Sequence, residues 1–238
     1  MNRELYGALI GAVTIASASL PPHFLIIAVA ILSYLMSREL ASALGEDEVS
    51  PLGFLSPAFF WVSPVAGMLY ASFVSLLFGT KKWELDSFVK TFFLMIYVGF
   101  FPSYLVLVRE EGFLPLLTLI LTIWTHDISA YYLGKKFGKK VLFEKLSPKK
   151  TIEGYVAGFT AGAVVFLILS GQELLKGTLM AVIVLTAGAL GDYFKSFIKR
   201  QKGIKDFSSA LGEHGGFVDR FDALIFSAPV YYWLLYGL

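Results

Sequence analysis

Apolar runs long enough to cross a lipid bilayer recur along the whole chain. A membrane-spanning helix needs about 20 consecutive, mostly apolar residues, because each residue adds about 1.5 Å along the helix axis. The chain is 56% hydrophobic and 16% charged, and its mean hydropathy is +0.69, whereas about a quarter of the residues in a soluble domain are charged. The sequence therefore predicts an all-α, polytopic integral membrane protein.

Eight apolar runs are the candidate transmembrane helices. They are Leu5–Leu20, His23–Met36, Phe54–Phe78, Ser87–Val108, Phe113–Leu133, Gly154–Ser170, Gly177–Leu190 and Phe217–Leu235. Pro57 and Pro64 interrupt the third run, which is either one tilted span or two short ones, so the total is eight or nine. No internal repeat or linker divides the chain, and we expect a single membrane domain over residues 1–238. The acidic stretch Glu39–Val49 is expected to be a loop.

Two lysine-rich stretches indicate the orientation in the membrane. Lys135–Lys150 contains seven lysines, and Lys195–Lys205 contains four lysines and one arginine. Two predicted spans separate these stretches, so both lie on the same side. The positive-inside rule makes that side cytoplasmic. We therefore expect a multi-pass protein of the cell (plasma or inner) membrane, with these stretches facing the cytoplasm.

Composition also excludes several classes of site. The chain has no cysteine, which removes disulfides, thiolate-bound zinc, iron–sulfur clusters and thiol catalysis. A net charge of +2 gives no reason to expect a nucleic-acid partner. Any metal must bind to carboxylates, histidines or carbonyl groups, and such oxygen-rich sites favour Mg²⁺-like ions.

Polar residues gather on one face of the segment GDYFKSFIKR. Asp192, Lys195, Ser196 and Lys199 are spaced i, i+3, i+4 and i+7, which places them on one side of a helix. One interpretation is a helix that leaves the membrane with a single Asp–Lys pair. The other is a face that holds a cation at the aspartate and phosphate oxygens at the lysines. Spacing alone leaves both open.

The segment EHGGFVDRFDALIF places a polar cluster at the start of the last span. Asp219 and Asp222 are i, i+3. One carboxylate there can simply cap the helix, but two of them with Arg220 and His214 indicate a site. Gly215–Gly216 would let the backbone approach a ligand, and free N–H groups there could bind an anion. The set suits a divalent cation that bridges phosphates.

Further candidates lie between residues 126 and 154. In LSPKKTIEG, membrane-surface lysines would explain Lys149 and Lys150, but they explain Ser147 and Glu153 less well, so we expect phosphate binding. Asp127 lies inside an apolar run and should have a partner and a functional role.

The neighbouring His126 is predicted to be a structural polar residue. The glycines of Gly154–Gly162, spaced as GxxxGxxxG, predict a close helix–helix contact, within the chain or between subunits.

The segment Ser196–Asp222, SFIKRQKGIKDFSSALGEHGGFVDRFD, resembles the signature of the phosphatidate cytidylyltransferases, or CDP-diacylglycerol synthases. The elements are a Ser, then Lys-Arg, Lys-Asp, His-Gly-Gly and Asp-Arg-x-Asp, in this order. DISAYYLGKKFGKK and LSPKKTIEG resemble two further stretches of that family. The resemblance covers Trp124–Asp222, so residues 113–238 are the expected catalytic half and residues 1–110 the variable N-terminal spans.

The resemblance implies an enzyme of phospholipid biosynthesis. CTP and phosphatidic acid would give CDP-diacylglycerol and pyrophosphate, with Mg²⁺ as cofactor and a second cation such as K⁺ at the same carboxylates. It also implies a homodimer in the bilayer and an active site that faces the cytoplasm.

At matching positions the resemblance assigns roles to individual residues. The metal-holding pair would be Asp192 and Asp219. The carboxylates that support or extend this site would be Asp222, Asp127 and Glu153. The phosphate-binding cations would be Lys149, Lys150, Lys199, Arg200, Lys205 and Arg220. The positioning residues would be Ser147, Ser196 and His214. The residues expected to act in catalysis itself are Asp192, Asp219, Asp222, Lys199, Lys205 and His214; the others would bind substrate.

Two other functions are alternatives. A CTP-dependent lipid-alcohol kinase, of the dolichol or phytol type, would transfer the γ-phosphate and release CDP, but the full signature favours the cytidylyltransferase. A cation-coupled transporter would use the aspartates as ion sites. It is disfavoured because no repeat is visible and the polar residues lie at one end of the spans.

Overall fold

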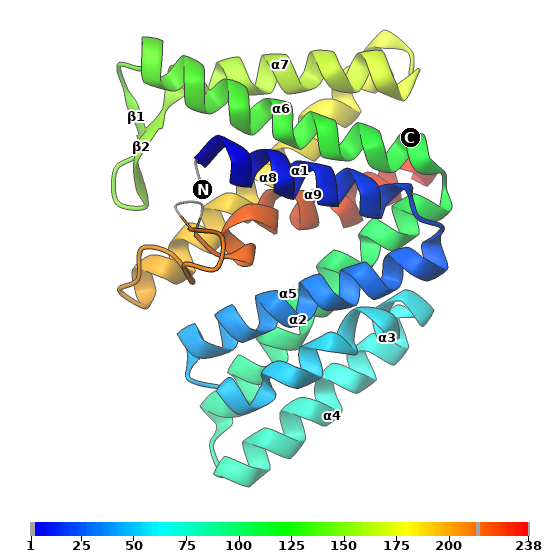
Figure 1. The fold of residues 1–238 in the computed structure, drawn as a ribbon, viewed down its shortest axis with the longest axis vertical. Helices are drawn as coiled ribbons and strands as arrows, with labels where there is room; N and C mark the ends of the chain where they lie inside the picture. Colours follow the sequence, from blue (N-terminus) through cyan, green and yellow to red (C-terminus); the bar gives the residue numbers. More distant parts are fainter. Residues whose placement is uncertain (1–2, 213–214, 238) are drawn as a thin grey trace. The chain divides into compact units, whose positions relative to one another are not determined.

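The computed structural model describes residues 3–212 and 215–237, and most of them are helical (Figure 1). The helices are α1 (Arg3–Ser19), α2 (Pro22–Leu44), the 3-10 helix η1 (Asp47–Phe54), α3 (Ser56–Val62), α4 (Pro64–Lys82), α5 (Leu85–Glu110), α6 (Phe113–Phe137), α7 (Ile152–Ser170), α8 (Leu174–Gln201) and α9 (Phe217–Gly237). Length and apolar composition suit five of them for crossing a membrane: α2, α5, α6, α7 and α8. The prediction of an all-α membrane protein is confirmed.

The predicted run Phe54–Phe78 is divided between two helices. α3 ends at Val62 and α4 begins at Pro64. The hydroxyl of Ser63 caps α4 by accepting a hydrogen bond from the N–H of Ala66 at 3.0 Å. Pro64 suits the first helical position, because the N–H that proline lacks would have no partner within the helix there. The seven residues of α3 rise only about 10 Å, so α3 cannot cross the bilayer by itself.

The chain folds as two compact units, the first made of Met1–Glu110 and Lys202–Phe221. α5 packs against α2, α3 and α4 in this unit. Gly99 permits the close approach of α3, because a Cβ there would overlap the hydroxyl of Ser56. That hydroxyl donates to the carbonyl of Met95 at 2.9 Å. The buried centre of the unit is therefore built on α5.

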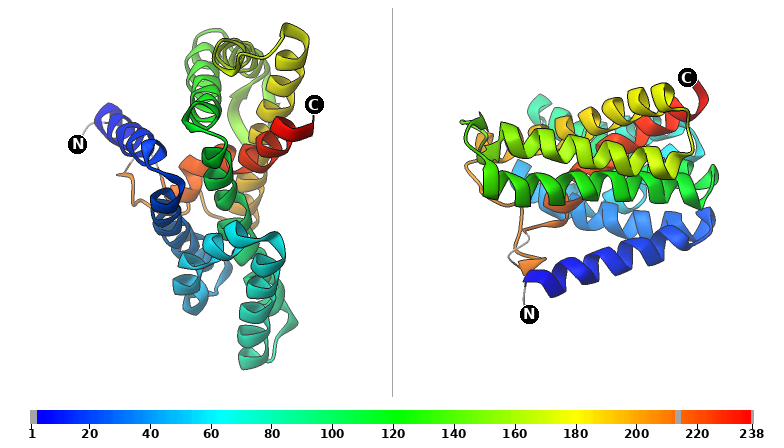
Figure 2. Two further views of the ribbon diagram at one scale, coloured as in Figure 1. Left: turned by 90° about the vertical axis from the view of Figure 1, so that its right-hand side faces the viewer. Right: turned by 90° about the horizontal axis from the view of Figure 1, so that it is seen from above.

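The second unit is made of Glu111–Gln201 and Asp222–Leu238. α6 (green) and α7 (yellow-green) lie side by side along their length (Figure 2). A Cβ on Gly158 would lie 2.7 Å from the carbonyl oxygen of His126, and one on Gly154 would lie 2.6 Å from that of Ala130. The predicted close helix–helix contact of the glycine stripe is thus confirmed, and it lies within the chain.

α9 packs against two helices of the second unit. The ring centroids of Phe166 on α7 and Tyr231 on α9 are 5.6 Å apart. A Cβ on Gly188 of α8 would lie 2.9 Å from the hydroxyl oxygen of Ser227. Small residues on α8 therefore let the backbone of α9 come close.

Part of the lysine-rich stretch before α7 forms an antiparallel hairpin of β1 (Val141–Phe143) and β2 (Ser147–Thr151). The hydroxyl of Thr151 caps α7 by accepting the N–H of Gly154 at 3.2 Å. The carboxylate of Glu153 accepts the N–H groups of Lys139 at 3.0 Å and Lys140 at 3.3 Å. Backbone contacts thus tie the hairpin to α7.

Candidate active site

Four charged side chains from three elements of the second unit meet in what we call the Asp192 cluster: Asp192 and Lys195 on α8, Asp222 on α9 and Lys150 on β2. The Lys195 ammonium lies 3.1 Å from Oδ1 of Asp192 and 2.8 Å from Oδ2 of Asp222. The Lys150 ammonium pairs with the other oxygen of Asp192. Two carboxylates and two ammonium groups therefore form one connected network.

Helix periodicity and a glycine bring the cluster together. Asp192 and Lys195 are i, i+3 on α8 and share a face. Gly191, just before them, lies against α9, since a Cβ there would be 2.9 Å from the carbonyl oxygen of Asp222. A larger residue at this position would push Asp222 away from Lys195.

The cluster is buried on one side and open on the other. Asp222 is 3% exposed and Lys195 is 7% exposed, and charges this deep are stable only when paired. Lys150 lies at the more open side. Burial of its ammonium, reinforced by the positive charge of Lys195, lowers the pKa of Lys150 to about 8. Lys199 adds a further positive charge that acts on Lys150. Several cations converge here, as anion binding requires.

Asp127 on α6 lies within electrostatic range of Lys150 and Asp222. Its carboxylate Oδ1 is 3.0 Å from Nδ1 of the neighbouring His126. His126 is 8% exposed, and its ring packs edge-on against Tyr155 and Phe159. The Asp127 side chain is 58% exposed, and its functional role stays a prediction. His126 has the packed surroundings of a structural residue.

The backbone N–H groups at the start of α9 were expected to bind an anion, but they are bonded within the protein. The N–H groups of Phe217 and Val218 donate to the carboxylate of Glu39, each at 2.9 Å. The N–H of Gly216 donates to Oδ2 of Asp219 at 3.1 Å, and the N–H of Gly215 donates to the carbonyl of Gly212. The prediction of free N–H groups for an anion at Gly215–Gly216 is wrong, because protein oxygens already accept them.

Asp219 combines a capping role with its predicted metal role. Its Oδ2 accepts the N–H of Phe207 at 3.0 Å as well as that of Gly216, which is the carboxylate half of a capping box. Asp219 belongs to the first unit and Asp222, three residues later on α9, to the second. The pairing of Asp192 with Asp219 at one metal stays a prediction.

The other predicted residues are distributed as follows. Glu153 binds the backbone at the base of the hairpin, and Arg200 donates from Nε to the carbonyl of Leu146 at 3.2 Å. Ser147 and Lys149 lie on β2, where Lys149 is exposed.

Ser196 is buried on α8, and Lys199 is in the last turn of that helix. Lys205 and Arg220 are exposed residues of the first unit. His214 lies outside the described residues.

The carboxylates suit a hard divalent cation. Within residues 3–212 and 215–237, no group of three or more His, Asp or Glu side chains gathers as a complete metal cage. Mg²⁺ does not need such a cage, since it commonly binds one or two carboxylates and takes water and substrate phosphates as its other ligands. Carboxylate oxygens of Asp192 and Asp222 both contact the Lys195 ammonium. Carboxylate oxygens are also the ligands that such an ion requires.

Sequence reasoning missed Glu39 as a site residue, and it missed the contact between Lys195 and Asp222. Lys195 was placed on the polar face of α8, but its bridging of two aspartates depends on α9 and has no local signal. Glu39 was assigned to a loop. In the structure α2 continues to Leu44, and Glu39 is buried within it. A carboxylate three residues after the apolar run His23–Met36 is the available signal.

Sequence comparison relates the chain to a family of known enzymes. The Cytidylyltransferase family profile matches residues 1–238. The phosphatidate cytidylyltransferase of Aquifex aeolicus (strain VF5) is 48% identical over 240 residues, covering 99% of this chain and 91% of that protein. The enzyme of the same name from Staphylococcus saprophyticus subsp. saprophyticus is 32% identical, covering 71% of this chain and 69% of that protein.

A third relative, the phosphatidate cytidylyltransferase of Thermotoga maritima, is 36% identical over 152 residues, which cover 58% of this chain and 55% of that protein. The match to the family profile extends over both compact units, so it includes the N-terminal helices as well as the Asp192 cluster. The chain belongs to the cytidylyltransferase family.

Proposed function

We propose that the chain is a phosphatidate cytidylyltransferase. A phosphate oxygen of phosphatidic acid attacks the α-phosphorus of CTP, the bond from that phosphorus to the bridging oxygen of pyrophosphate breaks, and CDP-diacylglycerol and pyrophosphate are formed. The observation that carries the proposal is the Asp192 cluster, in which paired carboxylates and lysines stand together in a member of this family.

The chemistry needs charge neutralisation more than a base. The attacking phosphate is already anionic at neutral pH, so no group has to remove a proton from it. Phosphoryl chemistry is accelerated mainly by positioning and by cations placed at the phosphate oxygens. Lys150, Lys195 and Lys199 supply positive charge on one side of the second unit, and Lys205 and Arg220 are exposed cations of the first.

Mg²⁺ is the proposed cofactor, with Asp192 and Asp219 as its carboxylate ligands and Asp222 and Asp127 in support. A second cation such as K⁺ would share these carboxylates. When bound, Mg²⁺ neutralises phosphate charge and orients the reacting groups. Lys195 would hold Asp192 and Asp222 in place, because its ammonium contacts both.

We further propose nine membrane spans in one membrane domain over residues 1–238. Lys82 at the end of α4 pairs with Glu46, just after α2, at 2.7 Å, so the ends of α2 and α4 lie on the same side. η1 and α3 would therefore return the chain across the membrane before α4 begins. The site would face the cytoplasm at the plasma or inner membrane, and the protein would act as a homodimer. The cysteine-free chain allows a direct test of sidedness. A thiol reagent that cannot cross membranes should label Gln172→Cys in intact cells, and Lys140→Cys only after permeabilisation. The reverse pattern would overturn the orientation.

The test of function is a product assay in detergent. The protein is mixed with phosphatidic acid, Mg²⁺ and CTP labelled on the α-phosphate. Transfer of the label into lipid, with release of pyrophosphate, supports the proposal. Label in soluble CDP would instead identify a kinase. Label that remains in CTP, with a relative of the family active in parallel, would refute catalysis of this reaction.

A further inference from the structure

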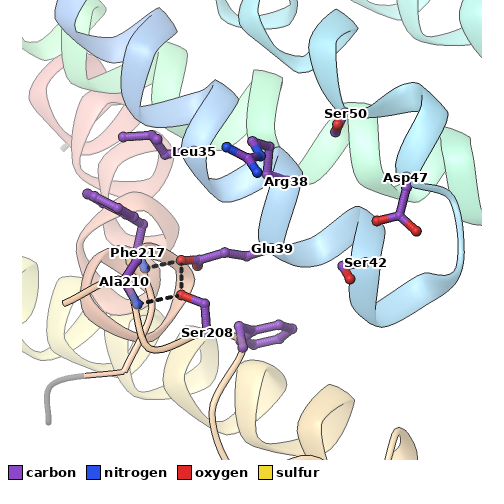
Figure 3. Close-up of a pocket in the computed structure, with 10 residues that line it drawn as sticks. Leu35, Arg38, Glu39, Ser42, Asp47, Ser50, Ser208, Ala210 and Phe217 are labelled. Atoms are coloured by element: carbon purple, nitrogen blue, oxygen red, sulfur yellow. Dashed lines mark hydrogen bonds between the residues drawn. The ribbon is translucent and has the colours of Figure 1, made fainter. Parts of the chain in front are cut away.

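Glu39 on α2 binds the segment that begins α9. Its Oε1 accepts the hydroxyl of Ser208 at 2.6 Å and the N–H of Phe217 at 2.9 Å (Figure 3). Its Oε2 accepts the N–H of Val218 at 2.9 Å. Phe217 and Val218 are the first two residues of α9. Glu39 is 178 residues from Phe217 in the sequence, so only the fold brings this carboxylate to the helix start.

These hydrogen bonds stabilise the charge of Glu39. The side chain is 7% exposed, and within residues 3–212 and 215–237 no lysine or arginine pairs with it. A buried carboxylate without a cation is stabilised by N–H donors and by the positive end of a helix dipole. The N–H groups at the start of α9 therefore stabilise the Glu39 carboxylate, and the carboxylate in turn caps the start of α9.

Asp219 forms a second set of hydrogen bonds to the same segment. Phe207 and Gly216 donate their N–H groups to Oδ2 of Asp219. Two carboxylates thus hold the described backbone on both sides of the turn. Glu39 binds Ser208 and Phe217, and Asp219 binds Phe207 and Gly216. The glycines make room for this arrangement, since a Cβ on Gly216 would lie 2.6 Å from Oε1 of Glu39, and one on Gly215 would lie 2.9 Å from Oδ2 of Asp219.

The segment also borders an open pocket of the first unit. The pocket has a volume of about 450 Å³, and its lining includes Glu39, Ser208 and Phe217 together with Arg38, Ser42 and Asp47 (Figure 3). Glu39 therefore stands between the pocket and the turn that carries Asp219. We therefore expect a substitution at Glu39 to act first on the local backbone of this turn.

We infer that Glu39 is a positioning residue for the cytidylyl transfer: it fixes the backbone at Ser208 and at Phe217–Val218 and, through it, the direction of the Asp219 carboxylate. The inference rests on the proposed function. Glu39 would touch neither substrate nor metal. Its contribution is to hold the turn in one arrangement, and misplacement of a reacting or metal-binding group by about 1 Å can cost about 100-fold in rate.

The test compares Glu39→Ala and Glu39→Gln with a matched control, Glu48→Gln, which removes an exposed carboxylate of the same unit. Hydrogen exchange is measured on peptides from Ser208–Gly212, Phe217–Leu224 and α5. Steady-state kinetics give kcat and KM for CTP, and a titration gives the Mg²⁺ concentration for half-maximal activity. The control should match the wild type in every readout.

For Glu39→Ala we expect kcat to fall about 100-fold, the half-maximal Mg²⁺ concentration to rise, and protection at Phe217 and Val218 to be lost while α5 stays protected. Glu39→Gln keeps one acceptor oxygen and should recover part of kcat and part of the protection. It also remains informative if Glu39→Ala fails to fold.

Unchanged kcat with lost protection at α9 would overturn the inference, and so would equal loss of protection in α5, which would indicate a general structural role. If the wild type makes no CDP-diacylglycerol, the proposed function fails, whereas the exchange data still report whether Glu39 holds the turn.

Discussion

The ammonium of Lys195 lies 2.8 Å from Oδ2 of Asp222, a carboxylate that is only 3% exposed. The same ammonium reaches Asp192 at 3.1 Å, so Lys195 compensates two carboxylates at once. Removing one member of a buried ion pair leaves the other charge uncompensated, which is more costly than removing both. This asymmetry makes the role of Lys195 measurable.

Lys195→Met keeps most of the aliphatic side chain and removes the charge. We expect it to destabilise the protein by about 3–5 kcal/mol and to abolish most activity, because Asp222 and Asp192 would repel each other. Thermal unfolding in detergent, followed by tryptophan fluorescence, measures the loss. The double variant Lys195→Met with Asp222→Asn should regain stability. A single variant as stable as the wild type would show that Lys195 does not compensate Asp222.

Asp219→Asn separates the capping role from the charge of this residue. An amide oxygen can still accept the N–H groups of Phe207 and Gly216, so we expect normal insertion and folding. Loss of the charge should lower kcat by about 100-fold or more, because it weakens a proposed ligand of the Mg²⁺ that neutralises the phosphates. Asp86→Asn, which removes an exposed partner of Lys90, is the control. Near-normal turnover of Asp219→Asn would remove it from the metal site.

Much of the helical framework could be predicted from the sequence. The run Phe113–Leu133 corresponds to α6, which begins at the same residue, and Gly154–Ser170 corresponds to α7. Hydropathy is a local property, so single segments reveal it. The shared face of Asp192 and Lys195 also followed from helix periodicity.

Contacts between distant segments could not be predicted in the same way. Nothing near Phe217 in the sequence indicates that its N–H will be accepted by Glu39, and nothing near Lys195 indicates that α9 will bring Asp222 to it. The hairpin of β1 and β2 was also missed, because a lysine-rich stretch beside a membrane is read most simply as a surface loop. The charged residues could be identified from the sequence, but their pairing depends on the tertiary structure.

Lys149 and Lys150 are neighbours on β2 with different surroundings. Lys150 pairs with Asp192, whereas Lys149 is exposed, since successive strand residues point to opposite faces. We expect Lys150→Met to lower kcat/KM for CTP by at least about tenfold more than Lys149→Met, because it removes a cation from the cluster. Lys136→Ala, at the exposed end of α6, should have only a mild effect. A larger loss at Lys149 than at Lys150 would contradict the assignment.

The packing of α6 on α7 gives a prediction that is independent of the chemistry. A Cβ on Gly158 would meet the backbone oxygen of His126 at 2.7 Å, and a helix backbone cannot shift as a flexible side chain can. Gly158→Ala should therefore destabilise the protein by about 1–3 kcal/mol, the usual cost of overpacking. Because His126 is bonded to Asp127, activity should fall as well. Gly237→Ala, where a Cβ meets nothing within 4 Å, is the control. Equal melting temperatures for both variants would refute the tight α6–α7 contact.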